Sequence, residues 1–196
     1  MDFYDAPRLA SEFVVLEPLD HSRCDELAEA VAVGDVWRAW YTNVPSPDQM
    51  ADEVRARLDL HAAKVKVPWV IVDPATDMAV GMTTFLNIDP INRRLEIGST
   101  WLGGAVQGTR INPAAKLLLL TRAFEDLGCM AVEFRTHWHN RQSRAAIEKL
   151  GAKQDGVLRR HTVMANGTVR DTVVYSIIDS EWPTVRYSLQ ERLVHA

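Results

Sequence analysis

The chain has 196 residues, of which 47% are hydrophobic and 24% are charged, a balance that excludes a disordered chain. Its net charge of −4 argues against a protein that coats nucleic acid. Within that total, residues 1–60 carry 13 acidic and 5 basic side chains, whereas the remainder carries 13 acidic and 17 basic ones. We therefore expect the two parts to meet different partners.

Cysteine content and hydropathy indicate the compartment. The two cysteines, Cys24 and Cys129, are too few for a disulfide framework and make a poor metal site. Residues 1–11 lack the apolar core of a signal peptide, and the apolar run 117–120 is too short to span a bilayer. We expect a soluble cytoplasmic protein with reduced cysteines, no metal and no membrane partner.

The first half of the chain predicts one strand, two helices and then three strands. Asp20 and Ser46 are the expected caps of the two helices, and Pro47 follows at a first helical position. Short turns after the fourth and fifth elements predict antiparallel hairpins. The expected ranges are 13–18, 20–33, 47–64, 69–72, 79–88 and 94–102.

The second half alternates helices and strands. A helix over 112–127 is expected to be capped by Asn112, with Pro113 next, and Asn166-Gly167 predicts a type I′ hairpin turn. The pattern predicts one domain over 1–196, of mixed α/β class, with a mostly antiparallel sheet and helices on its faces. The remaining expected elements are a strand at 131–137, a helix at 142–150, strands at 157–164 and 168–178, and a helix at 180–193.

The segment 101–116, WLGGAVQGTRINPAAK, predicts an anion-binding turn. A strand passes through glycines 103, 104 and 108 into the start of a helix, where free N–H groups and the helix dipole favour an anion. Glycines let a phosphate approach the backbone closely. The alternative is an ordinary strand-to-helix turn, because the segment matches neither the P-loop nor the dinucleotide fingerprint.

Several blocks of the chain resemble the GNAT N-acetyltransferase superfamily. Residues 107–112, QGTRIN, stand where that family has its pyrophosphate loop, Q/R-x-x-G-x-G/A. Residues 140–143, NRQS, match the family's N-x-x-S, and 146–152 match the helix that closes its cofactor site. Residues 157–161 and 171–176 resemble the ribosomal-protein-alanine acetyltransferase branch. Two departures stand in the loop: Arg110 replaces the first glycine and Asn112 replaces the last.

The resemblance implies a fold with splayed central strands and a site for acetyl-CoA between them. Backbone groups of Trp101 and Leu102 would bond the pantetheine amides, and Asn140 would bond the cofactor's arm. Either the Arg110 guanidinium clasps the phosphates, which we favour, or its side chain weakens cofactor binding. The cofactor-binding set is Trp101, Leu102, Gln107, Gly108, Thr109, Arg110, Ile111, Asn112, Asn140 and Ser143.

Acetyl transfer to an amine needs a base and, for the leaving thiolate, a hydrogen-bond donor. Glu96 is the first choice of base, because on a strand with Leu95 and Ile97 inward its carboxylate faces the opposite side. His161 is the second choice, since its ordinary pKa lies in the right range; His137 and His139 are weaker candidates. Ser143 would protonate the leaving thiolate or donate a hydrogen bond to it.

Acceptor binding is expected from the aromatic residues Trp37, Trp40 and Tyr41, whose alternative role is core packing. The resulting hypothesis is an acetyl-CoA-dependent N-acetyltransferase acting directly on a protein N-terminus or a small-molecule amine. The alternative is a non-catalytic acyl-CoA-binding module with a degenerate loop. The resemblance allows either a monomer or a homo-oligomer. The phosphates of the family's cofactor would suit a wall of basic residues, which we expect to consist of Arg110, Lys116, Arg141, Arg144, Arg159 and Arg160. The acidic first part would favour a cationic amine.

Overall fold

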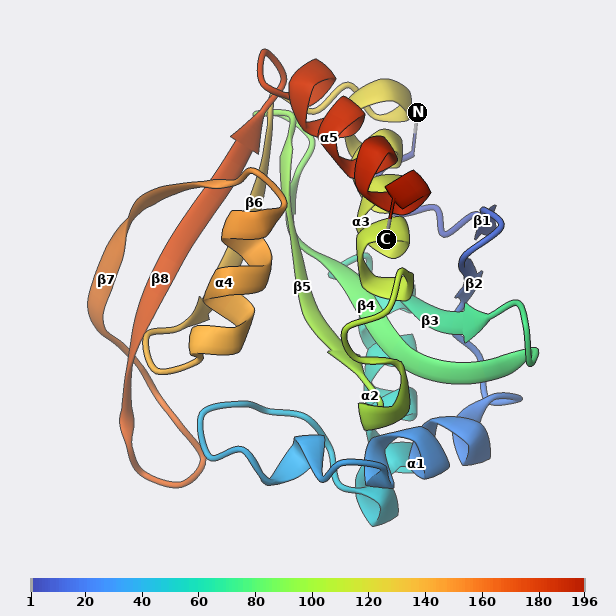
Figure 1. Cartoon of the computed structure of the whole chain (residues 1–196). Helices are drawn as coiled ribbons and strands as arrows, with labels where there is room; N and C mark the ends of the chain where they lie inside the picture. Colours follow the sequence, from blue (N-terminus) through green and yellow to red (C-terminus); the bar gives the residue numbers. More distant parts are fainter. Residues whose placement is uncertain (1, 196) are drawn as a thin grey trace.

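The computed structural model describes residues 2–195, and one eight-stranded sheet runs through them. The strand order is β1-β2-β3-β4-β5-β6-β8-β7, and every neighbouring pair is antiparallel except β5 and β6, which are parallel. This mixed, mostly antiparallel sheet confirms the predicted fold class (Figure 1). The strands are β1 Leu9–Ala10, β2 Val15–Pro18, β3 Val67–Asp73, β4 Met78–Asp89, β5 Arg94–Leu102, β6 Ala131–His137, β7 Lys153–Val163 and β8 Val169–Ile178.

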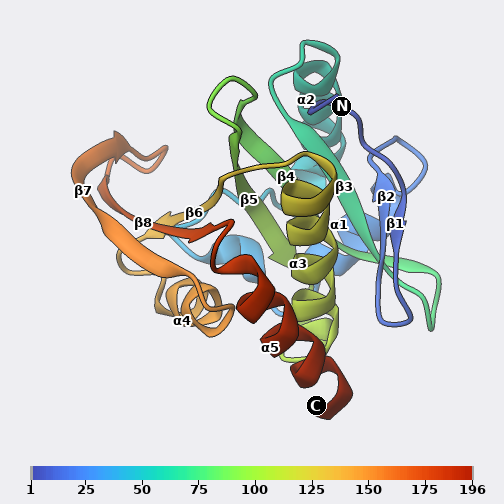
Figure 2. The same ribbon diagram turned by 90° about the horizontal axis from the view of Figure 1, so that it is seen from above.

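Helices cover both faces of the sheet, and each face has its own core. Along β3, Val67, Trp69 and Ile71 join one cluster, whereas Val70 and Val72 join the other, as the two-residue period of a strand requires. The first cluster packs α3, α4 and α5, and the second packs α1 and α2 (Figure 2). The helices are α1 Cys24–Ala32, α2 Met50–Ala62, α3 Ile111–Thr121, α4 Arg141–Lys149 and α5 Trp182–His195.

The two parallel strands β5 and β6 pair only at their beginnings. The register joins Arg94–Glu96 to Ala131–Glu133 and goes no further. Figure 1 shows the strands side by side at that end and apart further along, with the chain between α1 and α2 crossing the opening. The splayed central strands that the sequence led us to expect are therefore present.

A bulge in β5 lies just beyond this point. Met82 pairs with Trp101 and Thr84 with Gly98, so that Thr83 faces both Ser99 and Thr100. Ser99 takes up the extra residue with a φ of +46°, in the left-handed region that non-glycine residues rarely adopt. A bulge bends the strand that carries it, and β5 pairs with β6 only before this point.

Two of the three predicted helix caps were wrong. Asp20 accepts a hydrogen bond from the Ser22 amide in the turn before α1, which begins only at Cys24. Asn112 lies inside α3, because the helix begins at Ile111 and the Thr109 hydroxyl accepts the Ile111 amide instead. Ser46, by contrast, forms the expected capping box with Gln49 ahead of α2.

The β7–β8 turn is also not type I′. Gly167 has a φ of +81°, but Asn166 is not among the residues with positive φ. The Gly167 amide bonds the Met164 carbonyl, and the Met164 amide bonds the Thr168 carbonyl, which is a type I turn followed by a glycine bulge. Asn166 instead uses its side chain, which accepts from the Thr168 amide and hydroxyl.

The helix predicted over 112–127 consists of two parts in the structure. A π-helical turn, Arg122–Asp126, continues α3, and Gly128 with a φ of +66° ends it as the sequence predicts.

No helix among residues 2–195 is long and apolar enough to cross a membrane. The same residues contain no cluster of His, Cys, Asp or Glu that could hold a metal ion.

Candidate active site

The opening between β5 and β6 is a cleft of about 1830 Å³. One wall comes from β5 and the start of α3, and the other comes from β6 and α4. Most of the residues that the sequence singled out for cofactor binding line it: Trp101, Leu102, Gln107, Gly108, Thr109, Arg110, Asn112, Asn140 and Ser143. Ile111 is the exception, because its side chain is buried in the core between α3 and the sheet.

Free backbone donors gather where α3 begins. Within residues 2–195 the amide N–H groups of Gly108, Arg110 and Asn112 have no hydrogen-bond partner, and all three residues line the cleft. Gly108 has a φ of +78°, and a Cβ built on it would meet nothing within 4 Å. An open loop with free donors at the start of an eleven-residue helix fits the pyrophosphate of a bound nucleotide.

Gly103 and Gly104 serve packing rather than anion binding, which corrects the sequence interpretation. A Cβ on Gly103 would lie 2.6 Å from the Ala30 carbonyl oxygen, and one on Gly104 would lie 2.9 Å from that of Val33. The Gly104 amide also donates to the Val33 carbonyl over 2.9 Å. These two glycines let the end of β5 pass close to the end of α1, and only Gly108 faces open space.

Gln107 connects the two walls of the cleft. Its side-chain amide donates to the Leu102 carbonyl over 3.1 Å, and its oxygen accepts from the Gln142 side-chain amide over 3.2 Å.

The backbone carbonyls of Trp101 and Leu102 point to different sides of β5. The Trp101 carbonyl faces β4, where a Cβ on Gly81 would lie 2.2 Å away from it. The Trp101 carbonyl is therefore not directed into the cleft, and of the two expected backbone contacts only Leu102 retains a carbonyl on that side.

Arg110 occupies the residue position just before α3 and rests on an aromatic ring. Its guanidinium carbon lies 5.3 Å from the centre of the Phe13 ring, a cation–π contact. This contact carries the long side chain to one edge of the loop, so that the backbone amide beneath it stays free. The bulk of Arg110 therefore does not close the anion-binding turn.

Asn140 and Ser143 begin α4 on the opposite wall. The Asn140 carboxamide oxygen accepts the Ser143 amide over 3.0 Å and so caps the helix. The Asn140 side-chain NH₂ and the Ser143 hydroxyl have no partner within residues 2–195, and both residues line the cleft. Capping and ligand binding are thus compatible at Asn140.

Glu96 lies where the cleft meets a second cavity of about 790 Å³. The residue is 6% exposed, accepts a hydrogen bond from the Asn87 amide over 2.7 Å, and approaches the Arg135 guanidinium at 3.6 Å. Burial raises the pKa of this carboxyl, although Asn87 and nearby cations lower it in part. Leu95 and Ile97 point into the first core, as predicted, and Glu96 points away from it.

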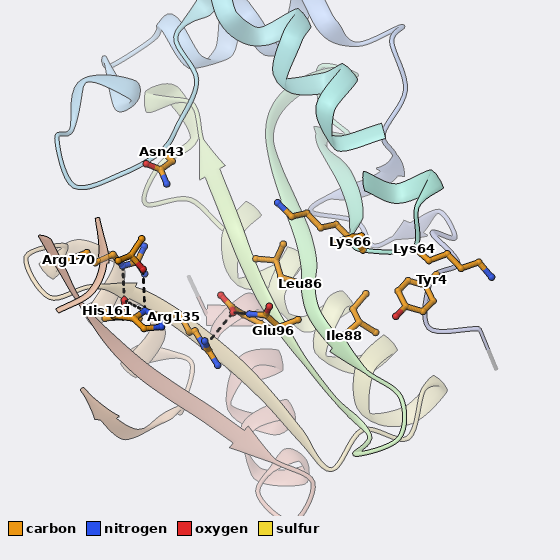
Figure 3. Close-up of a pocket in the computed structure, with 14 residues that line it drawn as sticks. Tyr4, Asn43, Lys64, Lys66, Leu86, Ile88, Glu96, Arg135, His161 and Arg170 are labelled. Carbon is orange, nitrogen blue, oxygen red and sulfur yellow. Dashed lines mark hydrogen bonds and ion pairs between the residues drawn. The ribbon is translucent and has the colours of Figure 1, made fainter. Parts of the chain in front are cut away.

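His161 lines the second cavity only, and Ser143 lines the first only. The His161 Nδ1 lies 3.0 Å from the Thr172 hydroxyl. Figure 3 shows His161 beside Arg170, across the cavity from the strand that carries Glu96. The structure therefore places Glu96 between the other two sequence-predicted catalytic residues.

The His137 ring is held in one orientation at the end of β6. Its Nδ1 accepts the His139 amide over 3.0 Å, so the ring hydrogen of the neutral form sits on Nε2. That Nε2 is buried without a partner within residues 2–195, and His137 lines the cleft. Burial lowers the pKa of His137, which keeps the imidazole neutral near pH 7.

Lys116 is a buried cation that sequence reasoning treated only as part of a basic wall. It is 6% exposed, lines the cleft, and donates to the Thr100 hydroxyl over 2.9 Å. No carboxylate of residues 2–195 pairs with it, and burial lowers its pKa to about 7. The side chain reaches from α3 to the bulged part of β5.

The three aromatic residues assigned to the acceptor separate in the structure. Tyr41 lines the cleft, whereas Trp37 packs against the core under α1 and α2 and takes the alternative role of packing. Trp40 is 49% exposed and packs edge-on against His137, with ring centres 5.2 Å apart. Its carbonyl accepts a hydrogen bond from Asn166 over 3.0 Å. Residues 39–44, here called the bridging segment, lie between α1 and α2 and reach the β7–β8 hairpin through this bond.

The predicted basic wall is only partly correct. Arg110 and Lys116 line the cleft, but Arg141, Arg144, Arg159 and Arg160 line neither cavity. Arg144 lies over the Trp138 ring and Arg159 pairs with Asp171. Other cations line the cavities instead, from strands and helices that the sequence analysis did not connect with the site: Arg57, Lys64, Lys66, Arg135, Lys149, Arg170 and Arg192.

Comparison with known proteins identifies the family. Residues 14–153 match the family described as the acetyltransferase (GNAT) domain. A structure from T. thermophilus described as an acetyltransferase is 32% identical, with a TM-score of 0.84 over 98% of this chain and 100% of the other. A GCN5-related N-acetyltransferase from Brucella melitensis is 29% identical, with a TM-score of 0.87 over 96% of this chain and 86% of the other.

A sequence relative comes from Bacillus subtilis (strain 168). It is YdaF, which carries the name of a ribosomal N-acetyltransferase, and it is 36% identical over 102 residues. The aligned part is 52% of this chain and spans only 55% of that relative's length. The match of the family model over most of the chain, together with the full-length structural likeness, shows that the chain belongs to the GNAT acetyltransferase family.

Proposed function

We propose that this chain is an acetyl-CoA-dependent N-acetyltransferase that transfers the acetyl group directly to an amine. One observation carries the proposal: a buried carboxylate, Glu96, stands where a cleft with free helix-terminal amides meets a second cavity. The family membership supports acetyl transfer in general. The second cavity gives an amine its own approach to the same point.

The residues of the cleft suit the parts of acetyl-CoA. The amides of Gly108, Arg110 and Asn112 would hold the pyrophosphate, and the Leu102 carbonyl and the Asn140 NH₂ would bond the pantetheine arm. The bound co-substrate would supply an acetyl group activated as a thioester. The cations Lys149 and Arg192 at the outer part of the cleft would face its remaining phosphate.

The side chains then divide the proton transfers between them. Glu96 would take the proton from the acceptor ammonium, directly or through a water, so that the neutral nitrogen can attack. As the new C–N bond forms and the C–S bond breaks, the Ser143 hydroxyl would donate a hydrogen bond to the departing sulfur, and the second proton of the attacking nitrogen would pass to that sulfur, which leaves an amide and a thiol. The His137 Nε2–H is a fixed donor in the same cleft and would bond an oxygen that gains negative charge.

The acceptor we propose is a protein N-terminus or a small-molecule amine, in the cytoplasm. The name of the B. subtilis relative points to ribosomal proteins as one source of such N-termini. The decisive assay incubates the chain with acetyl-CoA and a panel of peptides and small amines, and follows both thiol release and acetylated product. Tight acetyl-CoA binding with no turnover on any amine would favour the non-catalytic acyl-CoA-binding module instead.

A further inference from the structure

The second cavity holds an excess of positive charge. Four cations line it, namely Lys64, Lys66, Arg135 and Arg170, against one carboxylate, Glu96. Figure 3 shows Arg170 and Arg135 on one side of the cavity and Lys66 on the other, with its amine directed toward Asn43. We name Lys66, Arg135 and Arg170, which also line the main cleft, the cation cluster.

Existing carboxylates neutralise only part of this cluster. Arg135 bonds Glu133 over 2.8 Å and approaches Glu96 at 3.6 Å, and Glu133 is shared with Arg94. Lys66 and Arg170 have no ion pair with any carboxylate of residues 2–195. Two positive charges beside Glu96 therefore lack a partner.

The two terminal nitrogens of Arg170 make no hydrogen bond or ion pair within residues 2–195. Its Nε donates to the Thr172 hydroxyl over 2.9 Å, and Thr172 is 1% exposed in the middle of β8. Burial lowers the pKa of the Arg170 guanidinium, the charge of Glu96 raises it in part, and the charge of Arg135 lowers it further. A half-buried guanidinium anchored at Nε presents its two terminal NH₂ groups as a fork, which matches the two oxygens of a carboxylate.

An ordinary ammonium acceptor would be repelled by these charges. We propose that the amine acceptor carries a negatively charged carboxylate, and that Arg170 and Lys66 bind this group while Glu96 receives the amine's proton. The inference rests on the proposed function, whose acceptor class it narrows to anionic amines. It reverses the expectation of a cationic amine, because the acidic side chains of residues 1–60 do not line the second cavity.

Three matched peptides test this charge preference. Each is a tripeptide amide with N-terminal alanine, and the second residue is glutamate, glutamine or lysine, so that the reacting amine is nearly the same. We expect kcat/KM to fall in that order, by at least tenfold between the glutamate and lysine peptides. Arg170→Gln and Lys66→Gln should each reduce the ratio of kcat/KM between the glutamate and lysine peptides severalfold. Arg170→Lys should retain part of that ratio.

Arg55→Gln is the matched control, because Arg55 is an exposed cation on α2 that pairs with Asp52 and lines neither cavity. It should leave the ratio unchanged. Thermal unfolding of each variant checks that the fold survives the loss of the Arg170–Thr172 bond. If Arg170→Gln lowered kcat/KM by the same factor for all three peptides, the proposal would be overturned, because the cation cluster would then act only on the amine.

Calorimetry separates this inference from the proposed function. Binding of the glutamate peptide that is at least tenfold tighter than that of the lysine peptide, and that depends on Arg170, supports the inference even if no acetyl group is transferred. Acetylation of all three peptides with equal kcat/KM and equal affinity overturns the inference and leaves the proposed function standing.

Discussion

Asn166 donates a hydrogen bond to the Trp40 carbonyl over 3.0 Å, although 126 residues separate them. The bond fastens the bridging segment to the β7–β8 hairpin, across the opening between the splayed strands (Figure 1). It comes from the one turn residue whose side chain also holds the Thr168 amide and hydroxyl. The hairpin turn and the cover of the cleft are therefore organised by the same side chain.

Asn166→Asp should release the bridging segment without unfolding the hairpin. The substitution keeps Oδ1 as acceptor for Thr168 but replaces the donating NH₂ with an oxygen that faces the Trp40 carbonyl. We expect amide hydrogen exchange in residues 39–44 to accelerate severalfold, while exchange in β7 and β8 stays the same. Asn92→Asp, at the exposed β4–β5 turn, is the control. Faster exchange in both segments would mean that the turn itself had failed.

Glu96→Gln should lower kcat by a factor of about 10² to 10⁴, because a base is lost while the shape is kept. Burial raises the pKa of Glu96. As the pH is lowered, the wild-type rate should therefore begin to fall at a higher pH than it would if the base were an exposed glutamate. The acidic limb should vanish in the variant. Acetyl-CoA affinity measured by calorimetry serves as the control and should not change. A pH profile that keeps its acidic limb in Glu96→Gln would assign the base to another group, with His161 the next candidate.

Lys116→Met should stabilise the chain, and more so at neutral than at alkaline pH. Burial lowers the pKa of Lys116 from 10.5 to about 7, so between these pH values the unfolded chain binds a proton that the folded chain does not. Wild-type stability should therefore fall as pH decreases from 10.5 to 7 and change little from this source below that. At about 1.4 kcal/mol per pKa unit, the difference between variant and wild type at pH 7 is on the order of 4 kcal/mol.

Urea unfolding at pH 7 and pH 10 measures this difference. Lys149→Met is the control, since Lys149 is exposed at the end of α4 and its replacement should not alter the pH dependence. If Lys116→Met and wild type respond to pH alike, the Lys116 amine is hydrated in the folded chain and its pKa is ordinary.

Arg110→Gly should weaken acetyl-CoA binding about tenfold. The guanidinium at the edge of the loop adds positive charge near the expected pyrophosphate, whereas the free amides beneath it remain in the variant. Calorimetric titration with acetyl-CoA checks this, and Arg141→Gln, which removes a cation outside both cavities, is the control. An unchanged affinity in Arg110→Gly would contradict the clasp and leave the backbone as the anion site.

Sequence reasoning was most successful where a signal is local. The bounds of β5 and β6 were predicted as observed, because alternating apolar residues end at clear turns. It failed where two local signals compete. Asn112 is a good cap by residue type, but Thr109, three residues earlier, offers its hydroxyl to the first helical amide. Asn166 suits a type I′ turn, yet its side chain is committed to Thr168.

The acceptor side of the site was missed for a different reason. The cations of the cavity come from three strands, or from positions next to them, that are far apart in sequence and are brought together by the sheet: Lys66, Arg135 and Arg170. Their spacing along the chain does not show that they share one cavity with Glu96. The sheet order β5-β6-β8 brings two of the strands involved into contact across a long stretch of sequence. Charge counted along the chain therefore could not predict the charge of the cavity.

Gly98 has a consequence for the freedom of the Glu96 carboxylate. A Cβ at that position would lie 2.8 Å from the Glu96 carboxylate oxygen and equally close to the Leu86 side chain. A side chain introduced there would push the Glu96 carboxylate and the end of Leu86 aside, and so disturb the hydrogen bond between Glu96 and Asn87. The absence of a side chain at position 98 thus leaves the carboxylate of Glu96 room to keep its place between the two cavities.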